Sequence, residues 1–434
     1  MSKKILLTNA ALWAAYDGLT SIYLTAFALA LGATNVIIGL LGALPFIASI
    51  LTQIPGAELV QHFKRKKIYV TFCLIGRLFW IPILAAPFFF KEPILFVIIF
   101  YLFARLFETT ADPAYTSLLA DLVSEKHRGD FIGKRYRVLS SLGAVAMVLG
   151  GLWLKQFPKE SPVGFAIMFA FGTLLAIIAT LVIGKIKEPA YKDHDHHPVK
   201  EFFTLEGPMK TFVIFGTMFN FAFMLASPFF AVYMLKTLEL SYLQYGIASS
   251  IAVLAQIISS YYVGKLTDKY GDKPVAIIGH FGTVLIPLLF LMITKSNLWM
   301  IFVAQTLSGM VWATADISRY NLLLGTADAR KRAMQIAEYN LYGAIALAIA
   351  PIIGGWMSEN VTIIITGIPL LFVSSSILRF LSSLFLFKIQ EPRAKKEYPL
   401  VYVFKEAMHF HVNKGLVQGI QIVKKVATGL YGKI

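Results

Sequence analysis

The sequence has too little charge for a protein that is soluble in water. Only 15% of its 434 residues are charged and 57% are hydrophobic, whereas soluble chains carry about 25% charged residues. Cysteine is nearly absent, and a single residue, Cys73, excludes an intrachain disulfide framework and a cysteine-based metal site. These scarcities predict a protein whose solvent is the lipid bilayer.

The apolar residues fall into long runs. A helix needs roughly 20 mostly apolar residues to cross the hydrocarbon core. Twelve stretches meet this need, at residues 5–31, 34–60, 68–90, 93–120, 136–154, 162–184, 211–235, 240–264, 274–294, 297–325, 337–357 and 361–387. We therefore expect an all-α membrane protein with four parts, namely an N-terminal six-helix bundle (1–184), a cytoplasmic linker (185–210), a C-terminal six-helix bundle (211–388) and a cytoplasmic amphipathic basic tail (389–434).

The basic residues predict the orientation. The N-terminus, the even-numbered loops, the linker and the tail hold 30 of the 40 Lys and Arg residues, and the odd-numbered loops hold five. Short loops rich in Lys and Arg remain cytoplasmic, so both termini should be cytoplasmic in a multi-pass protein of the cytoplasmic membrane. Topology and attraction to anionic lipid then explain the net charge of +16 without nucleic acid. A helix on the lipid surface is expected where apolar tail residues share one stripe, at Leu416, Ile420, Val423, Ala427 and Leu430.

The two halves contain an internal repeat. At a constant offset, Thr110–Gly151 aligns without a gap on Thr314–Gly355. The identical positions include, in first-half numbers, Thr110, Ala111, Asp112, Leu118, Leu119, Arg128, Ile132, Ala144, Gly150 and Gly151. Apolar bias alone cannot produce the shared Thr-Ala-Asp, Arg and Gly-Gly, so the two bundles are expected to be pseudo-symmetric copies in the same orientation.

The loop after the eighth span carries a motif of glycine and charged residues. It reads Gly-Lys-Leu-Thr-Asp-Lys-Tyr-Gly-Asp-Lys and includes Gly264, Asp268, Gly271 and Lys273. This motif closely resembles the Gly-x-Leu-x-Asp-Arg-x-Gly-Arg-Lys loop signature of the major facilitator superfamily. The equivalent loop after the second span keeps Gly56 and a basic end, but Val and Phe replace the Asp and the second Gly.

The resemblance covers the whole chain, including a membrane Arg in the fourth span (Arg105) and Ala-Pro-Ile-Ile-Gly-Gly in the eleventh. It implies a twelve-span secondary transporter that moves a small organic solute by alternating access. In antiporter members a related proline signature is expected in the fifth span. Here Met147 stands where proline would be and only Gly150 and Gly151 remain, which weakens the inference of export.

The loop motif has a physical interpretation of its own. Gly264 and Gly271 allow a tight reversal and close helix approach. Asp268, with Lys273 nearby, can hold the other half by charge-assisted hydrogen bonds in one conformation and release it in another. We predict the same gating role for Arg128 and Arg332, at equivalent places in the two halves. The alternatives are a solvated turn and, for the arginines, a contact with lipid phosphate.

Eight ionisable residues lie at membrane depth, where charge is costly and usually faces a cavity or a partner. They are Asp17, Arg77, Arg105, Glu108, Asp112, Asp316, Arg319 and Arg379. The spacing of Arg105, Glu108 and Asp112 puts all three on one helix face. In the resembled superfamily, spans 1, 4, 7 and 10 line the central cavity, which implies that six of the eight surround one space.

The carboxylates are the proton-coupling candidates: Asp17, Glu108, Asp112 and Asp316. Asp17 and Glu108 are favoured because both lie near mid-depth, and Asp17 has no partner within its own span. The structural alternative is that Arg105 and Glu108 form a permanent pair while the other two aspartates brace the helix ends.

Substrate-binding candidates begin with Arg105 and Arg319, because guanidinium suits carboxylates and phosphates. Neutral candidates are Tyr16, Tyr23, Asn220, Gln256 and Trp312, although aromatic residues in membrane helices often only pack or anchor. Arg77 and Arg379 lie on spans that are peripheral by resemblance, so pairing with a neighbouring helix or snorkelling is favoured for them.

Together these patterns predict a monomeric, proton-coupled secondary transporter for a small organic solute, with no metal or cofactor. Export is slightly favoured over uptake. No Walker-type loop for ATP is present. The nearest alternative is an uptake symporter or uniporter. A channel would not need the gating loops, and a membrane-embedded enzyme would need a nucleophile with a base, or a metal cluster, at depth.

Overall fold

The computed structural model describes residues 2–123, 125–189, 207–328, 331–362, 365–391 and 398–409. These residues are almost entirely helical, and the one extended pairing among them is a single bridge between Thr362 and Thr366. The predicted tail helix and most of the predicted linker lie outside the described residues. The predicted all-α membrane fold is confirmed.

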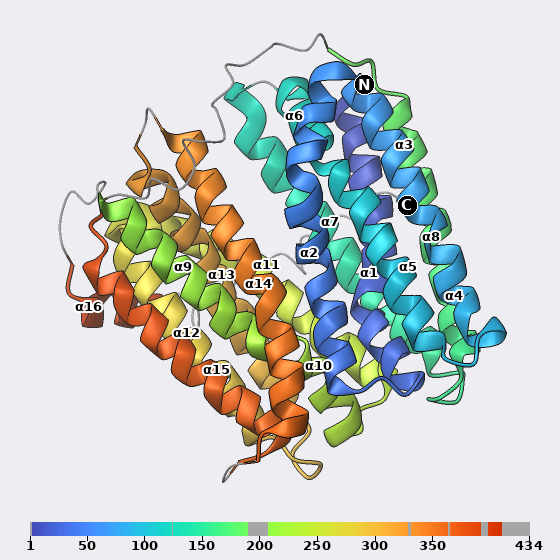
Figure 1. The fold of residues 1–434 in the computed structure, drawn as a ribbon. Coiled ribbons are helices and arrows are strands. Elements are labelled where there is room, and N and C mark those ends of the chain that lie inside the picture. Colours follow the sequence, from blue (N-terminus) through green and yellow to red (C-terminus); the bar gives the residue numbers. More distant parts are fainter. Residues whose placement is uncertain are drawn as a thin grey trace, which may run out of the picture.

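The first half of the chain forms eight helices on one side of the molecule (Figure 1). They are α1 (Ser2–Ala30), α2 (Asn35–His62), α3 (Arg65–Leu78), α4 (Trp80–Phe89), α5 (Pro93–Thr110), α6 (Asp112–Leu122), α7 (Glu125–Leu154) and α8 (Pro162–Gly184). Because α3 continues into α4 and α5 into α6, they make six spans.

The second half forms the other group of helices in Figure 1. They are α9 (Gly207–Ala226), α10 (Phe229–Val232), the π-helix η2 (Tyr233–Thr237), α11 (Tyr242–Tyr270), α12 (Asp272–Leu291), α13 (Met300–Thr326), α14 (Arg332–Asn360), α15 (Gly367–Ser383), the 3₁₀-helix η3 (Leu384–Lys388) and α16 (Leu400–His409). The first nine again make six spans, since α9, α10 and η2 form one span and α15 and η3 another.

Eleven helical segments among the described residues are long and apolar enough to cross a membrane. The one predicted span that is not among these eleven is the first, α1. It is 29 residues long but contains the polar residues Asn9, Tyr16 and Asp17. It packs between α7 and α8, and thirteen of its residues are buried. A helix that contacts protein on several sides needs less apolar surface than one facing lipid.

Proline explains two of the interruptions within spans. Pro113 is the second residue of α6, and its missing N–H and bulky ring separate α6 from α5 at Ala111. Pro228 stands between α9 and α10 in the same way. By contrast, α13, which is the repeat equivalent of α5 and α6, has Ile317 where Pro113 stands and runs without a break.

The contacts between the halves are duplicated. In one, Gly39 of α2 lies against the backbone carbonyl of Pro351 on α14, and in the other Gly246 of α11 lies against that of Met147 on α7. Met147 and Pro351 are equivalent positions of the repeat. Neither glycine leaves room for a Cβ atom, so both crossings need glycine for close backbone approach. The structure therefore carries the pseudo-symmetry expected from the repeat.

These close contacts lie toward one end of the molecule, which we call the loop face and define by loops 31–34, 155–161 and 238–241. Hydrogen bonds there join Asn35 N–H to the Glu359 carboxylate at 2.5 Å and the Lys159 ammonium to the Glu239 carbonyl at 3.1 Å. The opposite end, the linker face, carries residues 185–189 and the start of α9. Toward it, α2 and α14 diverge (Figure 1).

Three glycines at the linker-face ends of α7 and α11 face open space. A Cβ atom built on Gly129 or Gly133 of α7, or on Gly264 of α11, would meet nothing within 4 Å. The halves are thus closed at the loop face and apart at the linker face.

Candidate functional site

A polar cavity of about 540 Å³ lies against the second half. Its lining comes from α9, α11, α13 and α14, with one residue of α2, namely Phe46, Asn220, Phe223, Ala252, Val253, Gln256, Ser308, Gly309, Trp312, Asp316, Arg319, Tyr339, Asn340 and Leu347. Five predicted site residues meet there: Asn220, Gln256, Trp312, Asp316 and Arg319.

The charged centre of this cavity is a pair on one face of α13. Arg319 Nη2 donates to Asp316 Oδ1 at 3.0 Å, and Arg319 Nη1 donates to Asn220 Oδ1 on α9 at 3.1 Å. The side chains of Arg319 and Asp316 remain 21% and 40% exposed. The pair is therefore held in place and still reachable, as a site for a polar solute requires.

The predicted residues of the fourth span form a separate cluster inside the first half. Glu108 accepts from Arg77 of α3 at one carboxylate oxygen and from Arg105 at the other, the latter at 2.6 Å. Arg77 also lies over the Tyr16 ring, 4.7 Å from its centroid. Glu108, Arg77 and Tyr16 are buried. Two guanidinium groups thus share one carboxylate, and none of these four residues lines the 540 Å³ cavity.

Two predicted carboxylates of the first half stand apart from this cluster. Asp17 accepts a hydrogen bond from the Ser21 hydroxyl at 2.6 Å. The sequence had predicted no partner for Asp17 within its own span. Asp112 begins α6 beyond the break at Ala111, and it is exposed. Among the described residues neither forms an ion pair, although the sequence spacing had placed Asp112 on one face with Arg105.

Tyr23 lies at the contact between the halves and not in the cavity. Its hydroxyl donates to the Met147 carbonyl at 2.5 Å, and it lies against Gly151 and Gly246. The Tyr245 hydroxyl of α11 donates to the Ile22 carbonyl nearby at 3.2 Å. The Tyr23 bond therefore joins α1 to α7 within the first half, and the Tyr245 bond joins α11 of the second half to α1 near the loop face.

The predicted gating residues lie at the linker face. Gly264 has open space beside it, and Asp268 is exposed with no hydrogen bond or ion pair in the described part of the chain. Gly271 ends α11 with φ +91°, a conformation suited to glycine. Arg332 is exposed at the start of α14, whereas the side chain of Arg128 lies outside the description. Among the described side chains, no hydrogen bond or ion pair joins Asp268, Lys273 or Arg332 to the other half in this conformation, so the gating role stays a prediction.

A pair of glutamates was missed by the sequence reasoning. Glu391 accepts from the backbone N–H groups of Asp272 and Lys273 at the start of α12, at 2.5 and 3.1 Å. Glu188 accepts from Arg65 and Lys66 at the start of α3, at 2.8 and 3.4 Å. Each carboxylate neutralises the positive end of a helix. The signal was present as a repeated Lys-Ile-x-Glu-Pro at 185–189 and 388–392.

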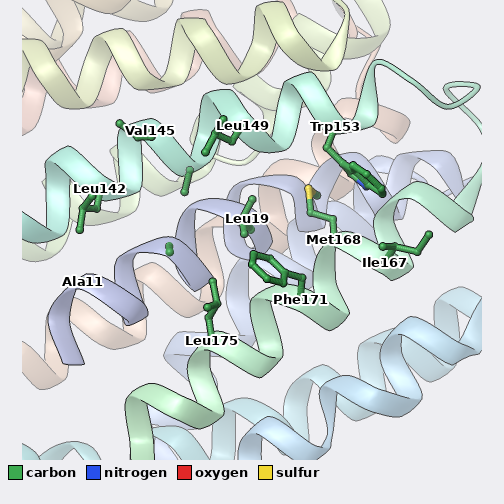
Figure 2. Close-up of a pocket in the computed structure, with 12 residues that line it drawn as sticks. Ala11, Leu19, Leu142, Val145, Leu149, Trp153, Ile167, Met168, Phe171 and Leu175 are labelled. Atoms are coloured by element: carbon green, nitrogen blue, oxygen red, sulfur yellow. The ribbon is translucent and has the colours of Figure 1, made fainter. Parts of the chain in front are cut away.

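A second cavity of about 540 Å³ has the opposite chemistry. It lies among α1, α7 and α8 and is lined by apolar side chains such as Leu142, Val145, Leu149 and Phe171 (Figure 2). These four are 41–56% exposed on the outside of the first half. A surface of this kind suits lipid chains and offers nothing to orient a polar solute.

The fold and the polar cavity define a polytopic helical membrane transporter. The family model of the Major Facilitator Superfamily matches residues 5–215 and 211–425, which is one match for each half. The chain belongs to this superfamily. It is a transporter of the secondary kind that carries a small solute, and it is not an enzyme.

Curated relatives match parts of the chain. A class H tetracycline resistance protein of Pasteurella multocida is 28% identical over 152 residues, which are 35% of this chain and 36% of that protein. A class B tetracycline resistance protein of Escherichia coli is 29% identical over 115 residues, 26% of this chain and 28% of that protein. The chain therefore matches well under two thirds of the length of either relative.

Solved structures match over nearly the full length. A D-xylose–proton symporter gives a TM-score of 0.71 at 14% identity and covers 91% of this chain and 99% of its own. A bacterial homologue of the human lysosomal transporter Spinster, inward-facing and occupied, gives 0.69 at 14% identity and covers 89% and 96%. At such identities the likeness shows the shared fold.

Proposed function

We propose that the protein is a proton-coupled exporter of a small amphiphilic organic solute, acting as a monomer in the cytoplasmic membrane with both termini in the cytoplasm. The observation that carries the substrate class is the make-up of the polar cavity. It offers a carboxylate and a guanidinium in Asp316 and Arg319, amides in Asn220 and Gln256, and the Trp312 ring. Such a mixture suits a molecule with polar or charged groups on an aromatic or apolar body.

The orientation follows from the basic residues. If the Lys- and Arg-rich side is cytoplasmic, the linker face is the inner face. The structure then corresponds to the inward-facing state, because the halves touch at the loop face and separate at the linker face. The partial likeness to two tetracycline resistance proteins favours export.

We place the coupling proton on Asp17. Among the described residues its carboxylate accepts one hydrogen bond, from the Ser21 hydroxyl, whereas both oxygens of Glu108 are occupied by arginine. A carboxylate in a fixed pair with two guanidinium groups is poorly suited to exchange protons during a cycle, and one with a single neutral partner is better suited. Asp112 and Asp316 remain as alternatives.

Transport by the full chain reconstituted in liposomes tests this proposal. With tetracycline as the probe, an imposed proton gradient should drive saturable accumulation in wild-type vesicles. Asp17→Asn should abolish gradient-driven accumulation while leaving exchange of probe across the membrane. The matched control is Asp130→Asn, an exposed aspartate near the linker face of α7, which should behave as wild type.

The same assay separates the alternatives. Accumulation that follows the proton gradient in the same direction as the protons indicates uptake symport, and saturable flux that ignores the gradient indicates a uniporter. Survival of gradient-driven transport in Asp17→Asn contradicts the assignment of the proton, and survival in Glu108→Gln as well excludes both favoured carboxylates. If tetracycline is not transported, a thermal-shift screen of other amphiphilic solutes identifies the substrate, because a bound ligand raises the apparent stability of the protein.

A further inference from the structure

A second, smaller polar cavity lies inside the second half. It has a volume of about 190 Å³ and is lined by Phe223, Ser227, Phe230, Ile286, Phe290, Gln305, Ser308, Trp312 and Arg379. Phe223, Ser308 and Trp312 also line the larger polar cavity that contains Asp316 and Arg319, so the two polar cavities share a wall. No acidic residue lines the smaller one.

Arg379 of α15 is the charged group of this cavity. It is 1% exposed, and Nη1 donates to the Thr283 carbonyl of α12 at 2.9 Å. That is the only hydrogen bond of the guanidinium among the described residues, and no carboxylate there lies within ion-pair distance. Nε is buried without a partner. The guanidinium therefore neither snorkels to an aqueous interface nor pairs with an acid on a neighbouring helix.

The surroundings of Arg379 hold the group without neutralising it. The Phe223 and Trp312 rings lie 5.7 and 5.8 Å from the guanidinium carbon. Aromatic faces attract a cation but leave its N–H groups free. The Ser227 and Ser308 hydroxyls and the Gln305 amide, which line the same space, have no hydrogen bonds in the described structure. All three can donate to an anion.

We propose that this cavity is a binding site for one monovalent anion, a halide or a carboxylate, held by Arg379 with help from Ser227, Gln305 and Ser308. A buried charge without a partner is strongly unfavourable, and an arginine with uncommitted N–H groups is suited to a small anion. One guanidinium and neutral donors match a single negative charge.

The anion has two possible sources. A halide would come from solution, and a carboxylate would be the anionic end of a solute whose body lies in the larger cavity beyond Trp312 and Ser308. The second source rests on the proposed function, whereas the first does not. A binding measurement on purified protein needs no transport, so it distinguishes failure of this inference from failure of the proposed function.

The test is thermal unfolding of the full chain in detergent, at constant pH and ionic strength, as chloride or acetate replaces a bulky morpholinoethanesulfonate anion. The wild-type midpoint should rise by roughly 1 to 3 °C with at least one of the two anions. Arg379→Met, which removes the charge and keeps most of the volume, should lose the rise. Arg137→Gln, at an exposed arginine of α7, should keep it.

Each outcome decides. A rise with chloride indicates the free anion, and a rise with acetate alone indicates the carboxylate end of a solute. A wild type that responds to neither anion, or an Arg379→Met variant that responds as wild type does, overturns the proposal and leaves a cavity that holds only water. If Arg379→Met cannot be purified, wild-type crystals grown in bromide and in acetate decide, because a bromide anomalous peak or acetate density beside Arg379 supports the site and the absence of both contradicts it.

Discussion

The two halves of the molecule treat a buried arginine in opposite ways. In the first half Arg77 is 3% exposed and pairs with one carboxylate oxygen of Glu108, and Arg105 pairs with the other oxygen. In the second half Arg379 is 1% exposed and has one backbone carbonyl as its hydrogen-bond partner. The first half therefore neutralises its buried arginine with an internal carboxylate, whereas the second half leaves the donors of Arg379 directed at a cavity.

The repeat shows how this difference arose on one scaffold. Gly309 and Trp312 occupy the positions in the second half that Arg105 and Glu108 occupy in the first. Both Gly309 and Trp312 line the polar cavity, whereas Arg105 and Glu108 occupy their own space with an ion pair. The two halves therefore share the crossings between them, whereas their interiors differ, with a buried ion-pair cluster in the first half and a polar cavity beside the second.

The largest expected effect comes from breaking the first-half cluster. Glu108→Ala should destabilise the protein by about 3 to 5 kcal/mol, because two guanidinium groups lose their only shared carboxylate in a buried place. Unfolding in detergent, followed by tryptophan fluorescence, measures the loss. Arg319→Gln is the matched second-half variant, and its partly exposed pair should be worth less than about 1 kcal/mol.

The double variant Arg77→Met with Glu108→Leu sharpens this comparison. Removal of both partners should restore part of the stability, because the remaining Arg105 is 28% exposed and can reach water. Equal losses in Glu108→Ala and Arg319→Gln would show that the two halves do not differ in the way described.

An intermediate effect is expected where the halves resemble each other. Gly39→Leu and Gly246→Leu should each disfavour the contact at the loop face by about 1 to 3 kcal/mol, which shifts the conformational equilibrium about 5- to 150-fold. Labelling of single cysteines near the loop face measures the shift. Gly133→Ala should leave it unchanged, since nothing lies within 4 Å of that position. Unequal shifts for the two leucine variants would break the pseudo-symmetry.

The smallest effect belongs to the helix-capping glutamates. Glu391→Gln and Glu188→Gln should each cost about 0.5 to 2 kcal/mol, because the N-termini of α12 and α3 lose a negative partner. The Glu188 variant should cost more, since its carboxylate also accepts from Arg65 Nε at 3.4 Å. Midpoints of thermal unfolding, with the exposed Glu58→Gln as reference, rank the three. No difference from Glu58→Gln would mean that the caps contribute nothing.

The sequence predicted the parts that depend on local pattern. Long apolar runs gave the spans, and the repeat anticipated the symmetric crossings, in which Gly151 lies against the Tyr242 carbonyl and Gly355 against the Asn35 carbonyl. Charge and polarity at membrane depth identified five cavity residues, among them Asp316 and Arg319. Each of these signals lies within one helix or in two aligned segments.

What the sequence did not predict depends on contacts between distant segments. The partner of Arg77 on α5 and the isolation of Arg379 are set by how helices rotate against one another, which periodicity does not fix. The separation of Asp112 from Arg105 follows from the break before Pro113, and that proline was a readable signal. The bond from Tyr23 to the Met147 carbonyl spans 124 residues, and nothing local announces it.

The central claim is that the polar cavity between the halves is reached from one side of the membrane at a time. Gln256→Cys tests it directly, because the single native cysteine, Cys73, is buried. In vesicles of defined orientation, a membrane-impermeant thiol reagent should label Gln256→Cys from the linker face, and Gly246→Leu should add labelling from the loop face. Absence of labelling from either face, or equal labelling from both faces without the glycine change, would contradict the account.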